Sequence, residues 1–179
     1  MKTEIKAMME EKIKGFRLPR YEEIPDVGFY LEQTTKYING YLEPIGWMEV
    51  TSAMISNYVK KGIIPKPIKK QYFAEHIAYL FFVVIAKNLL SMENIKLLIQ
   101  MQKKSYSNPV AYNYLCRELE NMLFYIFGLK ESPDIVGKSE TEERELLYSL
   151  VSSAAHVVYM HSAFGIIREQ HEQNTKEEK

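Results

Sequence analysis

The segment that decides the fold is residues 51–72, TSAMISNYVKKGIIPKPIKKQY. Thr51 or Ser52 can cap a helix at its N-terminus, and Gly62 is a typical residue just beyond a helix C-terminus. Between them, apolar side chains recur at the spacing that buries one face of a helix, namely at Ile55, Tyr58 and Val59. The prolines that follow cannot lie inside a helix. We therefore expect a short helix and then a β-ribbon or an extended loop.

The same segment concentrates positive charge. It holds five lysines and no Asp or Glu, so it carries +5 and the rest of this neutral chain sums to −5. The lysines are Lys60, Lys61, Lys66, Lys69 and Lys70. A local basic face, rather than the net charge, indicates nucleic-acid binding. A solvated surface explains such a run equally well when nothing else is known.

Most of the remaining chain has helical periodicity. We expect an all-α fold with a small β wing. Helices are predicted over 2–14 (ending at Gly15), 26–42 (capped by Asp26), 73–88, 91–104, 108–127 and 139–169. Helix 73–88 is apolar nearly all round and should be the buried centre. Residues 16–25 look like an extended connector, and the polar tail from His171 is expected to be disordered.

Composition bounds the class of protein. The chain has 179 residues, of which 46% are apolar and 26% are charged, as in ordinary soluble domains. Cys116 is the single cysteine, so no intrachain disulfide can form. The longest apolar run, 77–86, is shorter than the roughly 20 residues of a membrane span. With no secretory signal pattern at the N-terminus, we expect a cytoplasmic protein.

The order of these elements resembles the DNA-binding domain of MerR-type regulators. The residues that carry the resemblance are ISNY (55–58), GIIP (62–65), KQY (70–72), EHIAYL (75–80) and LSMENIKLL (90–98). The chain, including residues 18–20 (LPR), also resembles a bacterial domain-of-unknown-function family. The implied division is an N-terminal helix and connector (1–25), a winged helix-turn-helix (26–104), a helical dimerisation region (105–170) and the tail (171–179).

The resemblance implies a DNA-binding site on helix 51–61 and the wing. Small and polar outward side chains suit the major groove, and wing lysines suit phosphates. The predicted site comprises Thr51, Ser52, Ser56, Asn57, Tyr58, Lys60, Lys61, Lys66, Lys69, Lys70 and Tyr72. For Lys60 and Lys61, stabilisation of the helix dipole is an alternative. Asn57 either contacts a base edge or bonds locally, and Tyr58 is expected to pack under the wing.

The sequence departs from the resemblance at one place. MerR-like recognition helices commonly carry Arg followed by Tyr-Tyr, whereas residues 56–58 are Ser, Asn and Tyr. The missing Arg removes a strong phosphate or guanine contact. An interaction module that kept the fold but binds protein, such as an antirepressor or scaffold, is therefore the alternative to a DNA-binding regulator.

The C-terminal half suggests a homodimer. The last predicted helix has two adjoining apolar stripes, a wider surface than one neighbouring helix covers. The predicted dimer interface is Leu147, Leu150, Val151, Ala154 and Val158. The second stripe holds Leu146, Val157, Met160 and Phe164. A monomeric domain with a complete core is the alternative. Small-molecule sensing in this half is a third possible function, and it could coexist with DNA binding.

Catalytic and metal-binding patterns are weak. His156 and His161 are five residues apart and do not share a helix face as i, i+4 ligands would. There is no glycine-rich phosphate loop and no recognisable nucleophile–base pair. We therefore expect no enzyme, no metal and no cofactor, and duplex DNA as the partner.

Overall fold

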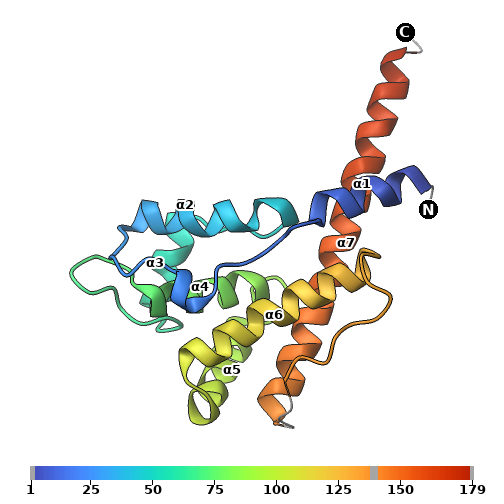
Figure 1. Ribbon diagram of the computed structural model, residues 1–179. Helices are drawn as coiled ribbons and strands as arrows, with labels where there is room; N and C mark the ends of the chain where they lie inside the picture. The colour runs from blue at the N-terminus through green and yellow to red at the C-terminus, as the bar shows by residue number, and fades with distance from the viewer. Residues whose placement is uncertain (1–2, 138–140, 178–179) are drawn as a thin grey trace.

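The computed structural model describes residues 3–137 and 141–177, and within these ranges the fold is all-helical (Figure 1). The helices are α1 (Thr3–Ile13), α2 (Leu31–Leu42), α3 (Ser52–Lys60), α4 (Ala74–Ala86), α5 (Met92–Ser105), α6 (Asn108–Ile126) and α7 (Glu142–Glu177). Two short 3-10 helices, η1 (Tyr21–Glu23) and η2 (Glu43–Ile45), precede and follow α2. The all-α prediction is confirmed.

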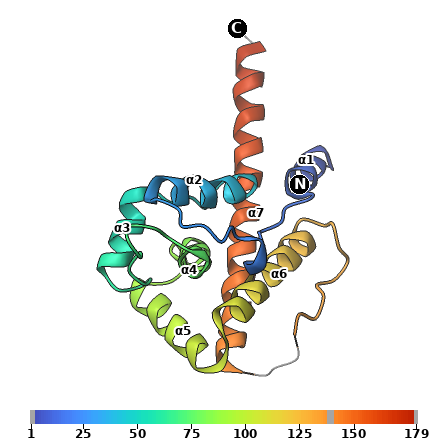
Figure 2. The same cartoon turned by 60° about the vertical axis from the view of Figure 1, so that its left-hand side comes forward.

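Helix α4 is the centre of the molecule, as its apolar sequence predicts. All its residues from His76 to Ala86 except Phe82 are buried. Figure 2 looks nearly along α4 and shows α2, α3, α5, α6 and α7 around it. One continuous core joins these helices and extends to Ile5 on α1 and Ile166 on α7. The two halves of the chain therefore share their hydrophobic core.

The long helix α7 packs along α6 and its C-terminal turns project beyond the body (Figure 1). It runs to Glu177, so the end expected near Glu169 is wrong, and residues 171–177 are helical rather than a disordered tail. No proline or glycine follows Ile166 to stop the helix. The cap expected at Ser139 lies outside the described residues.

The residues predicted to face a second copy are instead largely inside the chain. Leu150, Val151, Ala154 and Val158 are buried, and Leu147 is partly buried against the same core. Helices α1, α4, α5 and α6 all contact α7, which accounts for its wide apolar surface. The second apolar stripe of α7 is not covered in this way. Its residues Leu146, Met160 and Phe164 have 51%, 49% and 61% of their surface exposed.

Helix α2 begins later than the sequence suggests. It starts at Leu31 and not near Asp26 because the preceding residues are extended and pair with the loop before α4. Phe29 N–H donates to Tyr72 O at 2.9 Å, and Tyr72 N–H donates to Phe29 O at 2.8 Å. A Cβ on Gly28 would lie 2.6 Å from Cβ of Gln71, so glycine permits this close approach.

The predicted β wing is not confirmed. In the ranges that the structure describes, residues 63–73 form a loop with two isolated antiparallel bridges, Phe29 with Tyr72 and Ile68 with Gln71, and no regular strand. Pro65 and Pro67 each lack an N–H and limit ladder pairing on this stretch. We refer to residues 63–73 as the lysine loop.

One described helix is long and apolar enough to cross a membrane, namely α7 over Glu142–Glu172. Length and composition alone are weak evidence for a span, because the core helix of a soluble protein passes the same test. Here Val151, Ala154 and Val158 are buried against the rest of the chain.

Candidate nucleic-acid interface

Helix α3 begins and ends at the residues that its sequence predicts. The Thr51 hydroxyl accepts a hydrogen bond from Met54 N at 3.2 Å. At the other end Gly62 has φ +64, and the N–H groups of Gly62 and Ile63 donate to Val59 O and Tyr58 O at 3.0 Å. These two bonds form a Schellman motif. Buried Ile55 and Tyr58 fix which face of α3 points outward.

The outward face of α3 presents Ser56, Asn57, Lys60 and Lys61, all exposed. Ser56 Oγ donates to Ser52 O at 3.0 Å, within the helix. Ser52 Oγ lies 3.1 Å from the hydroxyl of Thr35 on α2, so its hydroxyl holds the two helices together. In the described part of the chain the Asn57 amide has no hydrogen-bond partner. Asn57 is therefore the best-placed side chain on α3 for reading a base edge.

The tip of the lysine loop is a two-residue turn. Ile68 N–H donates to Gln71 O at 3.0 Å, and Gln71 N–H donates to Ile68 O at 2.9 Å. The two residues between them, Lys69 and Lys70, have φ values of 49° and 65°. Positive φ at both central positions is the type I′ pattern, which Asn-Gly or Gly-Gly usually occupies. Two exposed lysines are thus held in a conformation that costs a non-glycine residue about 1 kcal/mol each.

His76 fastens the lysine loop to α4. Its Nδ1 accepts from the backbone N–H of Phe73 at 3.1 Å, and its Nε2 lies 3.0 Å from Lys66 O. A carbonyl oxygen only accepts, so Nε2 carries the proton and the imidazole is the neutral tautomer. The side chain is buried, with 3% of its surface exposed. It closes the loop near both ends and thereby positions Lys66.

Two predicted contact residues belong to the support of this surface. Tyr58 and Tyr72 are buried, with 3% and 4% of their surface exposed. Burial raises the pKa of both phenols. The Tyr72 ring packs edge-on against His76, with centroids 5.7 Å apart. The expectation that Tyr58 packs under the loop agrees with this burial. Tyr58 and Tyr72 both belong to the predicted site, and their buried rings offer almost no surface for a direct contact.

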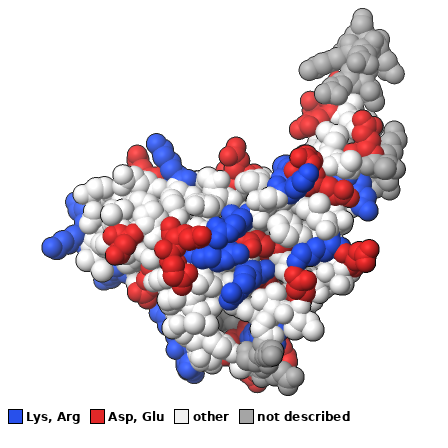
Figure 3. Space-filling model, viewed as in Figure 1, with Lys and Arg blue, Asp and Glu red and all other residues white. Residues whose placement is uncertain are grey.

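The lysines of α3 and the loop are not neutralised by neighbouring acids. Within residues 3–137 and 141–177, no carboxylate forms an ion pair with Lys60, Lys61, Lys66, Lys69 or Lys70. Figure 3 shows blue side chains at the left-hand tip of the molecule and acidic ones further toward its centre. Lys96 Nζ on α5 lies near Gly62 and adds a cation beside the end of α3.

The family model of a domain of unknown function, DUF1836, matches residues 19–115. This is more than half of the chain. The protein belongs to the DUF1836 family. No curated protein and no solved structure shows significant similarity to it.

The DUF1836 match spans η1 to the first half of α6 and includes α3, the lysine loop and α4.

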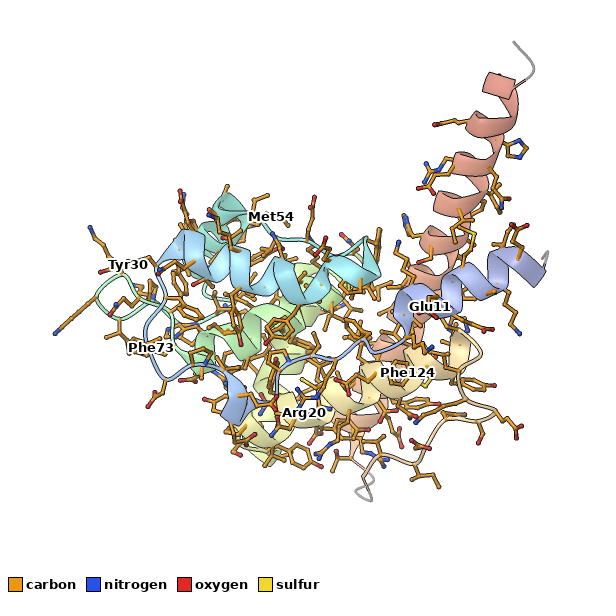
Figure 4. All side chains as sticks on the ribbon, turned by 45° about the horizontal axis from the view of Figure 1, so that its top comes forward. Glu11, Arg20, Tyr30, Met54, Phe73 and Phe124 are labelled. Atoms are coloured by element: carbon orange, nitrogen blue, oxygen red, sulfur yellow. The ribbon has the colours of Figure 1, made fainter. Side chains whose placement is uncertain are left out.

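Near the start of the matched range, Arg20 makes an ion pair that the sequence alone does not reveal. Both its terminal nitrogens donate to Glu120 on α6 at 2.7 Å, and Leu18 N–H donates to the same carboxylate at 2.9 Å. Hydrogen bonding to Glu120 raises the pKa of Arg20. Figure 4 shows Arg20 near the start of α6, while Tyr30 and Phe73 lie at the end of the molecule that carries the lysine loop.

Proposed function

We propose that this DUF1836 protein is a DNA-binding transcriptional regulator with a winged helix-turn-helix of MerR-like type. In this proposal α3 enters the major groove and the lysine loop follows the phosphate backbone. The observation that carries it is a set of exposed lysines, at the end of α3 and on the lysine loop, that form no ion pair within the described residues. His76 fastens that loop, which directly follows α3 and its exposed Asn57. A fastened loop holds its charges in place, so little freedom is lost when phosphates are bound.

The dimensions and chemistry of α3 support this proposal. A single helix fits the major groove, which is about 12 Å wide. Asn can contact adenine at both N6 and N7. Lys60 and Lys61, at the C-terminal end of α3, are exposed and able to reach the groove wall. Because the strong Arg contact of MerR-like helices is missing, we expect phosphate contacts to supply most of the affinity.

We further propose that the protein acts in the cytoplasm as a homodimer. The interface assigned from the sequence is buried within one chain, so the second stripe of α7 takes its place. Met160 and Phe164 lie exposed toward the projecting part of α7, and Leu146 lies exposed near its start. Burying such side chains favours association. A two-fold dimer suits an operator whose half-sites are about one DNA turn apart.

The experiment that tests this function is selection of bound fragments from a random duplex pool with the purified full chain. We expect enrichment of a common motif, arranged as an inverted repeat if the dimer binds. A pool that remains random after repeated rounds at low salt would contradict the regulator.

A protein-binding module is the second candidate. Leu97 and Leu146 are both more than half exposed and border an apolar groove between α5 and α7, together with Leu90 and Met101. Exposed apolar surface of this kind marks interaction sites. Charge reversal at Lys69 and Lys70 distinguishes the candidates, because it abolishes DNA binding but leaves capture of a partner at that groove intact.

A further inference from the structure

A cavity of about 260 Å³ lies where α4, α5, α6 and α7 meet. Its wall is mostly apolar and includes Ala78, Phe82, Leu98, Leu115 and Leu147. It is larger than the roughly 150 Å³ apolar cavity that takes up one benzene ring. A cavity of this size accommodates a molecule of about two fused rings.

Aromatic side chains line much of the same wall. Five rings line it: Tyr79 and Phe82 on α4, Tyr106 between α5 and α6, and Tyr112 and Tyr114 on α6. Lys103 Nζ lies 4.9 Å from the centre of the Tyr79 ring. Stacked and edge-to-face contacts with such rings favour a flat aromatic guest over an aliphatic one.

Among the residues that the structure describes, two residues of the wall, Tyr112 and Glu143, each have a buried polar side-chain atom without a hydrogen-bond partner. Oε1 of Glu143, in the first turn of α7, is buried and accepts no hydrogen bond. Hydrogen bonding from Ser105 lowers the pKa of this carboxyl, so it is ionised at neutral pH. A buried acceptor without a donor is unfavourable. A guest with a suitably placed donor would remove that cost.

The charges around the cavity argue against a charged guest. Arg117 and Arg144 line it together with Glu143. An anion placed in contact with Oε1 of Glu143 would be repelled by that carboxylate, and a cation would lie beside two guanidinium groups. A neutral molecule with a single O–H or N–H group avoids both repulsions and still satisfies Glu143.

We propose that this cavity binds a neutral two-ring aromatic molecule whose O–H or N–H donates to Oε1 of Glu143. The rings lie among Tyr79, Phe82 and Leu115. The site is separate from the lysine loop, and its occupancy does not depend on whether the protein binds DNA. Because α4 and α5 form one wall and α6 and α7 the other, the guest ties the two halves of the fold together.

The test uses two probes on the free full chain, 2-naphthol and 2-methoxynaphthalene, which share the rings but differ in the donor. We expect 2-naphthol to bind more tightly by on the order of tenfold or more, the usual range for a hydrogen bond to a charged group. Glu143→Ala should bring 2-naphthol down to the affinity of 2-methoxynaphthalene. Glu145→Ala, an exposed acid in the same turn, should leave both affinities unchanged.

Ala111→Phe places a ring in the cavity and should abolish binding of both probes, with circular dichroism checking that the variant folds. Nuclear Overhauser contacts between bound 2-naphthol and the methyl groups of Leu98 and Leu115 locate the site even where that variant does not fold. Equal affinity of both probes for the wild-type protein, undiminished 2-naphthol binding by Glu143→Ala, or no binding at all would overturn the proposal.

Discussion

The carbonyl oxygen of Lys66 accepts a hydrogen bond from Nε2 of His76 at 3.0 Å. Nδ1 of the same ring accepts from Phe73 N–H, so one buried side chain holds two points of the lysine loop against the central helix. The proposed DNA-binding surface therefore depends on α4 as well as on its own sequence. A substitution at His76 is therefore expected to displace the lysines of the loop, although it does not change their charge.

His76→Ala should destabilise the protein by about 2–4 kcal/mol, because it removes a buried ring and leaves two polar backbone groups without partners. Urea unfolding measures this change, and faster amide exchange at Phe73 reports release of the loop. His156→Ala, on the exposed side of α7, serves as the control and should shift stability by less than about 0.5 kcal/mol. A small, equal effect of both variants would show that His76 does not hold the loop.

Lys70→Gly should move stability and DNA affinity in opposite directions. Glycine relieves the positive φ at this position, and we expect a gain of up to about 1 kcal/mol in the free energy of unfolding. The loss of one cation should weaken binding to all duplexes. Lys66→Gly, at a residue without positive φ, should lose affinity with no gain in stability. A destabilised Lys70→Gly variant is the contrary result.

Asn57→Ala tests whether α3 reads sequence. If the Asn57 amide contacts an adenine edge, the variant should lose about 1–3 kcal/mol of discrimination between the selected motif and random DNA. Affinity for random DNA should hardly change, since Asn57 carries no charge. Competition binding with labelled duplexes measures both. An equal loss on every sequence would mean that Asn57 only positions the helix.

Two substitutions that introduce a carboxylate on α7 distinguish its buried core face from its proposed dimer interface. Ala154 is fully buried, so Ala154→Glu should unfold the protein or prevent its expression. Phe164 is 61% exposed, so Phe164→Glu should keep the fold and yield a monomer. Sedimentation at micromolar concentration, with circular dichroism as the check on folding, measures both effects. A wild-type monomer at high concentration would remove the dimer from the proposal.

Local signals predicted α3 and α5 well because the residues that cap them lie within or beside the helices. The Thr51 cap, the glycine at position 62, and Ser91, whose hydroxyl accepts from Asn94 N, are each visible in a few consecutive residues. The start of α2 was mispredicted because it is set by a distant pairing, between Phe29 and Tyr72. No local pattern around Asp26 contains that information.

The candidate site divides in the same way. The basic segment and the outward face of α3 follow from charge and helical spacing. The His76 contact joins residues on two elements, and the sequence offers only a histidine at the third position of a helix as a signal. For α7, the spacing of apolar residues indicates how wide its apolar surface is, but it does not indicate how many helices of the same chain cover that surface. The helical pattern alone therefore predicts a partner for Val151 and Val158, whereas four other helices of the same chain contact α7 and bury them.

The central claim is tested most directly by the salt dependence of duplex DNA binding. We expect log affinity to fall linearly with log salt concentration, with a slope of about −0.9 per phosphate neutralised. Replacing Lys66, Lys69 and Lys70 together by Ala should reduce the steepness of that slope by up to about 2.7. Replacing Lys6, Lys12 and Lys14 on and just after α1 changes the net charge equally and should leave the slope unchanged. No detectable binding at low salt, or the same loss from both triple variants, would contradict the assignment of the lysine loop as a DNA-binding surface.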